Sequence, residues 1–179
     1  MFTEAVRTGY ESLGIDGYYL NHCDDYKNPH FEIIKTLLIE YIQENDIGNN
    51  ILDLCCGSGE ITTILEEKGN YNIEGIDPYT CKLYENNTNK KCYQYSFKDI
   101  VNGFLDNKKY DTIICSFAMH LCDISMLDTL LYQLSRICKK LIIITPNKRP
   151  EIKNWFELRE EKIYERVRLR VYKNKCLAI

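Results

Sequence analysis

Short apolar runs alternate with stretches of helical periodicity along most of this chain of 179 residues. The apolar runs predict five strands, at residues 51–54, 71–76, 92–95, 111–115 and 141–145. Between them apolar residues recur at helical spacing, most clearly from Leu127 to Leu134. Strands that alternate with helices predict an α/β fold, a doubly wound and mainly parallel sheet with helices on both faces.

The end of the chain follows a different pattern, in which apolar and basic residues alternate. The alternating positions are Val167, Leu169 and Val171 on one side and Arg166, Arg168 and Arg170 on the other. A period of two residues predicts a strand with one face in water, which is typical of an antiparallel strand at the edge of such a sheet.

The length of the chain predicts one domain over residues 1–179. Within it, residues 1–47 precede the alternating pattern and predict an N-terminal helical cap segment, while residues 48–179 form the sheet core. A short helix is expected at residues 2–13. Asn28 and Pro29 predict the start of a second helix, because asparagine caps helices and proline suits the first helical position. That helix should stop at Gly48.

Glycines follow the first predicted strand, in the segment ILDLCCGSGEIT. Gly57 and Gly59 permit a tight turn into a helix, and their missing side chains let a ligand approach the backbone. Asp53 precedes this turn, and Asp77 ends the second strand in GIDP. A carboxylate at that strand end can accept hydrogen bonds from both hydroxyls of a ribose. Together the two features favour a nucleoside ligand over an ordinary turn.

The segments DLCCGSGE and GIDP resemble the first two motifs of the class I (Rossmann-like) S-adenosylmethionine-dependent methyltransferases, over about residues 45–145. YKNPH and RVRLRVY are similar to a group of small, uncharacterised methyltransferases. The resemblance implies a methyltransferase with S-adenosyl-L-methionine as its cofactor. The implied contacts are Asp53, Cys55, Gly57 and Gly59 for the methionine part, Asp77 with Pro78 for the ribose, Ser96 and Phe97 for the adenine, and Ser116 for the wall beside the reacting methyl.

Two rival nucleotide-binding functions are disfavoured by the residues of the first turn. Dinucleotide-binding dehydrogenases have a third glycine for close packing of helix on strand, and Thr62 stands at that position. A nucleoside triphosphatase would have a lysine after the turn, and this segment has none.

His120, five residues beyond the fourth strand, is the candidate general base, although a loop histidine more often packs on the cofactor or on the following helix. Tyr19, Tyr26 and His30 belong to an aromatic N-terminal stretch that could cover the cleft as a lid for the substrate. Aromatic faces suit a sulfonium cation. The same stretch could instead pack on the sheet.

The fourth strand ends in Cys115-Ser116-Phe117-Ala118, which lacks the Asn/Asp-Pro-Pro-aromatic pattern of enzymes that methylate amino groups of nucleic acids. No cysteine follows a proline, so cytosine C5 chemistry is disfavoured. Asp123 is the one carboxylate near this strand end, so a metal-dependent catechol-type site is disfavoured too. We therefore expect a small-molecule or protein acceptor. A non-catalytic or partner-activated cofactor-binding subunit and an RNA methyltransferase remain the alternatives.

Charge is unevenly distributed along the chain, whose net charge is −3. Residues 1–138 carry 11 Lys/Arg against 21 Asp/Glu, whereas residues 139–179 carry 12 against 5. Lys148, Arg149 and the arginines at 166, 168 and 170 form the basic end. These side chains either attract an anionic acceptor such as RNA, a phosphorylated metabolite or an acidic peptide, or only form the water-exposed face of an edge strand.

Nine cysteines are present, and none of them forms a C-x-x-C pair or a cluster with zinc spacing. We interpret them as reduced, buried side chains of a cytoplasmic protein, with no metal site. No apolar run is long enough to span a membrane, and the N-terminal residues lack an apolar signal core.

Overall fold

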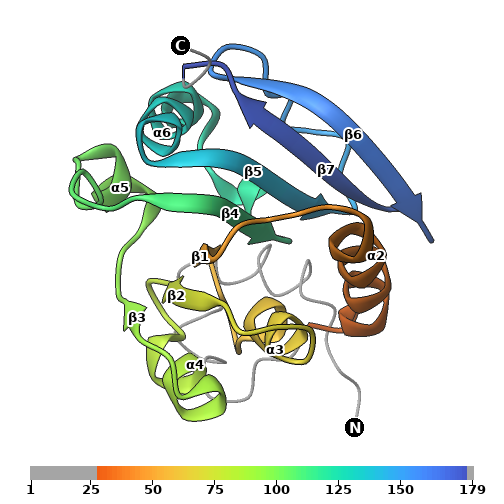
Figure 1. Cartoon of the computed structure of the whole chain (residues 1–179). Helices are drawn as coiled ribbons and strands as arrows, with labels where there is room; N and C mark the ends of the chain where they lie inside the picture. Colours follow the sequence, from red (N-terminus) through yellow and green to blue (C-terminus); the bar gives the residue numbers. More distant parts are fainter. Residues whose placement is uncertain (1–27, 177–179) are drawn as a thin grey trace, which may run out of the picture.

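Seven strands form one sheet in the order β3-β2-β1-β4-β5-β7-β6 in a computed structural model of the chain, which describes residues 28–176 (Figure 1). The helices are α2 (Phe31–Glu44), α3 (Glu60–Glu66), α4 (Cys81–Thr88), α5 (Phe97–Val101), the 3-10 helix η1 (Met119–Leu121) and α6 (Ile124–Ile137). The strands are β1 (Asn50–Leu54), β2 (Asn72–Ile76), β3 (Cys92–Tyr93), β4 (Tyr110–Ser116), β5 (Cys138–Thr145), β6 (Phe156–Tyr164) and β7 (Val167–Asn174).

Strands β1 to β5 are parallel to one another, and β7 pairs with β5 in the antiparallel direction. Leu54 of β1 is in register with Ile76 of β2 and with Cys115 of β4. The carboxyl ends of these strands therefore meet at one edge of the sheet, where ligands bind in doubly wound folds. The predicted fold class, a mainly parallel sheet with helices on both faces, is confirmed.

The edge of the sheet is a hairpin rather than the single strand that the alternation predicts. Strand β6 pairs with β7 along its length and lies outside it. The two strands are joined at Glu165 and Arg166, whose φ angles of 45° and 70° lie in the left-handed region. Hairpin turns of this kind usually carry glycine or asparagine, so this turn has no sequence signal and the first strand of the pair is not recognisable.

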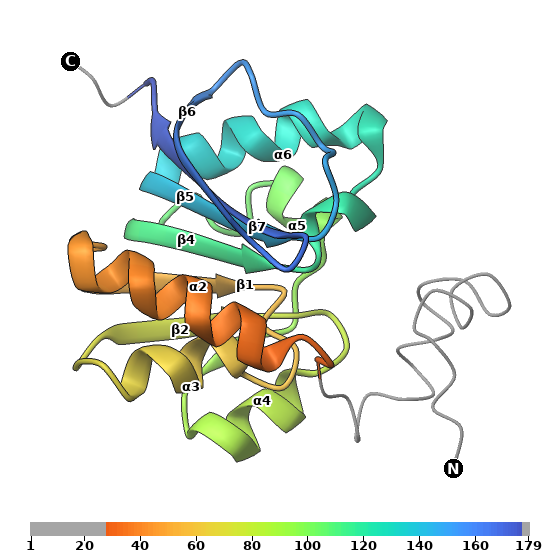
Figure 2. The same ribbon diagram turned by 90° about the vertical axis from the view of Figure 1, so that its right-hand side faces the viewer.

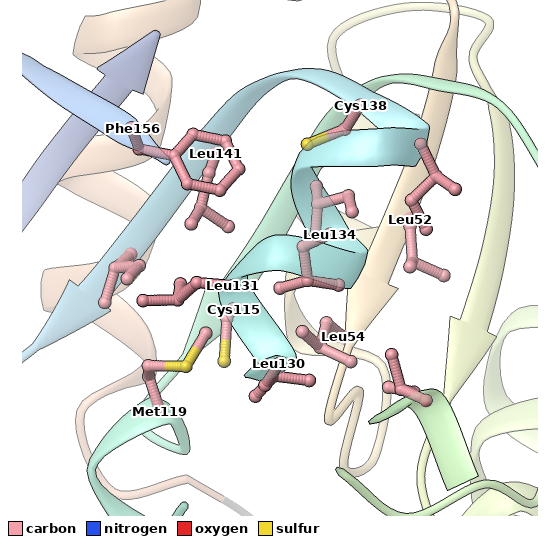
Figure 3. Packing of buried hydrophobic residues seen from close by; sticks show 14 of the residues in the cluster. Leu52, Leu54, Cys115, Met119, Leu130, Leu131, Leu134, Cys138, Leu141 and Phe156 are labelled. Atoms are coloured by element: carbon pink, nitrogen blue, oxygen red, sulfur yellow. The ribbon is translucent and has the colours of Figure 1, made fainter. Parts of the chain in front are cut away.

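Helices cover both faces of the sheet (Figure 2), and each face has its own hydrophobic core. On one face α6 packs with α5, and Figure 3 shows Leu130, Leu131 and Leu134 of α6 over Leu52, Leu54, Cys115 and Leu141 of the strands. On the other face α2 and α3 cover Ile51, Ile114 and Ile142. Burying a leucine or isoleucine stabilises the fold by roughly 1.5–3 kcal/mol, so these two layers fix the strand ends that carry the site.

Helix α2 begins two residues later than predicted and ends at Glu44 instead of continuing to Gly48. The Asn28 side-chain oxygen accepts a hydrogen bond from the backbone N–H of His30 at 2.9 Å, so asparagine shapes the turn before the helix. Ile34, Leu38 and other buried residues of α2 pack on the sheet. This part of the predicted cap segment thus forms a layer of the core, and the helix predicted at residues 2–13 lies outside the described residues.

A disulfide joins Cys81, at the start of α4, to Cys92 of β3, which corrects the expectation that the cysteines are all reduced. The Sγ atom of Cys56 lies 3.7 Å from that of Cys92. The pairing has no sequence signal, because eleven residues separate the two cysteines and only the fold of α4 back onto the sheet brings them together. The free cysteines among the described residues are Cys55, Cys56, Cys115, Cys122, Cys138 and Cys176.

The described residues contain no group of three or more His, Cys, Asp and Glu side chains arranged to hold a metal ion. None of the helices in residues 28–176 has the length and apolar character needed to cross a membrane.

Candidate functional site

The turn between β1 and α3 runs through left-handed backbone conformations. The φ angle is 59° at Cys55, 56° at Gly57 and 96° at Gly59. Glycine adopts such angles without strain, whereas Cys55 is a non-glycine residue in the same region. The turn at the carboxyl edge of the sheet therefore has the tight backbone conformation that the sequence predicts for Gly57 and Gly59.

Asp77 lies beside this turn at the carboxyl end of β2, and only 7% of the residue is exposed. Its Oδ2 atom accepts a hydrogen bond from the N–H of Gly57 at 3.3 Å. Its Oδ1 atom accepts from the N–H groups of Tyr79 and Thr80 at 2.8 and 2.9 Å. The carboxylate thus connects the two predicted motifs directly and also fixes the segment through the half-buried Pro78 into α4.

Asp53 is buried under the turn, with an exposed fraction of 1%. Its Oδ2 atom accepts hydrogen bonds from the N–H of Thr62 at 3.3 Å and from the Thr62 hydroxyl at 2.8 Å. The same hydroxyl lies 2.9 Å from the Tyr84 hydroxyl. Burial raises the pKa of Asp53 well above its usual range. Thr62, which stands at the third-glycine position, therefore anchors α3 to Asp53, a role that the sequence does not reveal.

Gly59 faces helix α4. A Cβ atom at this position would lie 2.5 Å from Cγ2 of Thr88 and 3.3 Å from the ring of Tyr84. Together with its positive φ, this close approach explains why a glycine is needed here. Of the two predicted glycines, Gly59 sets the packing of the turn on α4, and Gly57 adjoins Asp77.

Ser96 begins helix α5 as its N-cap. Its N–H and hydroxyl donate to Oδ2 of Asp99 at 2.8 and 2.7 Å, and its Oγ accepts from the N–H of Asp99 at 3.3 Å. These bonds form a capping box, so the predicted adenine residue Ser96 uses its hydroxyl locally. Phe97, the other residue of that pair, is half-buried against the core.

Ser116 ends β4 on the other side of the turn. Its Oγ atom is buried and has no hydrogen-bond partner, a state that it shares with Oγ1 of Thr80 among the buried side-chain atoms of residues 28–176. A small pocket lies between Ser116 and the turn, lined by Asn28, Asp53, Cys55, Cys56, Gly57, Glu60, Ile61 and Ser116. An orphaned buried hydroxyl marks a place where a ligand group can bind.

The segment before α2 reaches this pocket. The ring of His30 stacks on Phe117, the residue after β4, with 5.0 Å between ring centroids. Oε1 of Glu60 accepts hydrogen bonds from the N–H of Asn28 at 3.0 Å and from the Ser58 hydroxyl at 2.8 Å. Glu60 thus connects the N-terminal segment to the glycine turn, a contact between residues distant in sequence. Tyr19 and Tyr26 lie outside the described residues.

A second, larger pocket of about 800 Å³ opens at the carboxyl ends of β4 and β5. We call it the β4–β5 pocket, and its lining residues are Met119, His120, Cys122, Ile124, Leu127, Asn147, Lys148, Arg149, Pro150 and Glu151. His120 is exposed at its wall, and desolvation by the surrounding chain lowers the pKa of the imidazole below its usual range. A neutral imidazole can accept a proton, as the predicted role of His120 requires.

Residues 51–140 match the family model described as a methyltransferase domain. The chain belongs to this family. The match covers half of the chain, from β1 to the start of β5, and so includes the glycine turn, Asp77 and Ser116. The protein is a class I methyltransferase that depends on S-adenosylmethionine.

The methyltransferase is similar to an uncharacterised protein of Schizosaccharomyces pombe, at 27% identity over 97% of this chain and 93% of that protein. Its fold is similar to a SAM-dependent methyltransferase of Anabaena variabilis, with a TM-score of 0.65 and 10% identity over 97% of this chain and 96% of the other. It is also similar to magnesium protoporphyrin IX methyltransferase of Synechocystis, solved with bound SAM, with a TM-score of 0.61 and 16% identity over 93% of each chain.

The described residues of the methyltransferase fit the cofactor. S-adenosylmethionine carries a ribose with two hydroxyl donors and an amino-acid tail. Beside Gly57, the structure offers the buried carboxylate of Asp77 and the unpartnered hydroxyl of Ser116. These groups come from β1, β2 and β4, whose ends meet at one edge of the sheet.

The basic strand of the methyltransferase does not present a row of free arginines, which corrects one interpretation of the sequence. Arg170 pairs with Glu161 of β6 at 2.8 Å and also donates to the carbonyl oxygen of Lys148 at 3.0 Å. Arg168 donates to the carbonyl oxygen of Pro146 at 3.3 Å. Both side chains are largely covered, at 17% and 11% exposure for Arg168 and Arg170. They support the hairpin and the loop after β5.

Proposed function

We propose that the protein transfers a methyl group from S-adenosylmethionine to a small molecule bound in the β4–β5 pocket. The observation that supports this most directly is the course of the chain after β4. Ser116 lines the small pocket beside the glycine turn, and Met119 and His120, three and four residues further on, line the β4–β5 pocket. One short segment thus separates the proposed cofactor site from the proposed acceptor site.

The cofactor contacts in this proposal follow from the placement of the side chains. Asp77 accepts hydrogen bonds from the ribose hydroxyls, and the backbone at Gly57 borders the methionine part. The Ser116 hydroxyl, which has no partner within residues 28–176, forms a hydrogen bond with the methionine part. Asp53 acts as a positioning residue, because its carboxylate holds Thr62 and the start of α3. Phe97 is the first residue of α5, directly after its cap Ser96, and contributes its ring face to the binding of the adenine.

Bound S-adenosylmethionine would supply the methyl group for an in-line displacement, with a lone pair of the acceptor as nucleophile and the sulfur as leaving group. The protein contributes mainly alignment to such a reaction. His120 is placed to take the proton that the acceptor loses, because its imidazole faces the β4–β5 pocket and its pKa is lowered. His30, stacked on Phe117, borders the same segment from the other side.

The substitution Asp77→Asn tests the cofactor site, because asparagine keeps an oxygen for the N–H groups of Tyr79 and Thr80 but removes the charge and one acceptor. We expect the affinity for S-adenosylhomocysteine, measured by titration calorimetry, to fall about 30-fold, equivalent to roughly 2 kcal/mol. The matched control is Asp106→Asn, whose carboxylate is exposed and paired with Arg136. Equal affinity in wild type and Asp77→Asn would refute the assignment.

A further inference from the structure

The β4–β5 pocket has two walls of different chemistry. The apolar wall comes from η1, α6 and the loop after β5, and consists of Met119, Ile124, Leu127 and Pro150. Ile124 is 82% exposed, so its side chain is accessible to a ligand in the pocket. The polar wall consists of His120, Asn147, Lys148, Arg149 and Glu151.

The loop after β5, which carries Asn147, Lys148, Arg149 and Glu151 of the polar wall, is held by side chains of β7. The guanidinium groups of Arg168 and Arg170 donate to the carbonyl oxygens of Pro146 and Lys148 at 3.3 and 3.0 Å. The Thr145 hydroxyl accepts from the N–H of Asn147 at 3.1 Å. Three contacts within four residues fix the backbone, so Lys148 and Arg149 are presented by an organised loop.

The loop after β5 has more positive than negative side chains that lack an ion-pair partner among the described residues. Glu151 pairs with Lys153 at 2.5 Å, and Arg170 pairs with Glu161. Within residues 28–176, no carboxylate lies at ion-pair distance from the side chains of Lys148 and Arg149. These two cations are therefore available to a ligand in the pocket that His120 also lines.

We propose that the methyl acceptor is a small amphiphilic anion, whose apolar body packs on Met119, Ile124 and Leu127 and whose phosphate or carboxylate group binds Lys148 and Arg149. This inference rests on the proposed function and makes Lys148 and Arg149 specificity-determining residues. The volume of about 800 Å³ suits one small molecule. A nucleic acid would need a longer basic surface, and Arg168 and Arg170 are already engaged within the fold.

Three probe molecules test the proposal on the full chain saturated with S-adenosylhomocysteine: phenyl phosphate, benzoate and the neutral benzyl alcohol. Dissociation constants are measured by NMR titration. We expect phenyl phosphate or benzoate to bind about tenfold more tightly than benzyl alcohol, because only the anions form hydrogen-bonded ion pairs with Lys148 and Arg149. The preferred anion identifies the acceptor group as phosphate or carboxylate.

Removing the charges of Lys148 and Arg149 tests whether the anionic probes bind at these two residues. In the double variant Lys148→Gln/Arg149→Gln we expect anion affinity to fall about tenfold and benzyl alcohol affinity to stay constant. The matched control Arg159→Gln/Lys173→Gln removes two charges at a pocket near the opposite end of β5 and should retain wild-type anion affinity. Equal binding of neutral and anionic probes, or equal anion loss in the two double variants, would overturn the proposal. Displacement of phenyl phosphate by a short single-stranded RNA would also overturn it.

Calorimetry of the double variant with S-adenosylhomocysteine separates this proposal from the proposed function. If the double variant keeps its affinity for S-adenosylhomocysteine and loses affinity for the anionic probes, the result supports both the proposed function and the proposed acceptor class. If the wild type does not bind S-adenosylhomocysteine, the proposed function fails. If it binds the cofactor but does not prefer anions, only the acceptor class fails.

Discussion

The turn after β1 and the loop after β5 lie at the same edge of the sheet but are built in different ways. Positive φ angles and buried hydrogen bonds to Asp53 and Asp77 fix the first. Arginines from β7, about twenty residues further along the chain, fix the second. The glycines and carboxylates of the first turn leave a motif in the sequence, although Asp77 lies 20 residues beyond Gly57. Carbonyl oxygens that accept hydrogen bonds from arginines of another strand leave no such motif.

This difference explains what each region reveals. In the proposed function, the turn after β1 binds a part of the ligand that is common to the family, so glycines and a carboxylate at fixed spacing suffice to recognise it. The loop after β5 faces the proposed acceptor, and its side chains form a pocket only after α6 and the hairpin have folded around it. The cofactor can therefore be identified from the sequence, whereas the proposed acceptor class is inferred from the structure.

The largest effect is expected where the first turn is packed most tightly. In Gly59→Ala the new Cβ would lie 2.5 Å from Cγ2 of Thr88, at a φ of 96° that alanine disfavours. We expect the free energy of unfolding, measured by urea denaturation, to fall by about 3 kcal/mol. Adding Thr88→Ser, which removes Cγ2 and keeps the hydroxyl bonded to the carbonyl of Tyr84, should restore part of that loss.

Gly103→Ala is the matched control, because Gly103 also has a positive φ, of 90°. The nearest atom to its new Cβ is Oδ2 of Asp106 at 2.9 Å, the end of an exposed side chain that can move. This variant should lose only about 1 kcal/mol. Equal losses at Gly59 and Gly103 would show that backbone conformation alone, and not packing on α4, accounts for the glycine in the turn.

The sequence predicts the parts of the fold that rest on local patterns. The five parallel strands lie where the apolar runs predict them, and Gly57 and Asp77 come together as their spacing predicts. The features that are missed lack a distinctive pattern. The β6 strand is missed because its turn lacks glycine, and Ser96, predicted to contact adenine, instead forms a local capping box with Asp99. Glu60 and Asn28, 32 residues apart, meet only in the folded chain.

Asp53→Asn tests whether the buried carboxyl of the first turn carries its proton in the folded protein. Because burial raises the folded-state pKa, the folded protein holds the proton to higher pH than the unfolded chain does. The free energy of unfolding of the wild type should therefore decline as pH rises above the usual carboxyl range, by at most about 1.4 kcal/mol per pH unit. Asparagine removes this decline, which denaturation at several pH values would detect. Parallel pH profiles would contradict the assignment.

The smallest effect on stability is expected at the second loop, where it separates the two regions most clearly. Arg170→Ala removes the hydrogen bond to the carbonyl of Lys148 and the ion pair with Glu161, and should lower the free energy of unfolding by about 1 kcal/mol. Arg159→Ala, whose ion pair with Glu157 is exposed, should change it by less than about 0.5 kcal/mol. Because the loop holds Lys148 while the first turn is untouched, Arg170→Ala should weaken phenyl phosphate binding and leave S-adenosylhomocysteine binding unchanged. If both affinities fell together, the two regions would form one cooperative site and the contrast between them would be wrong.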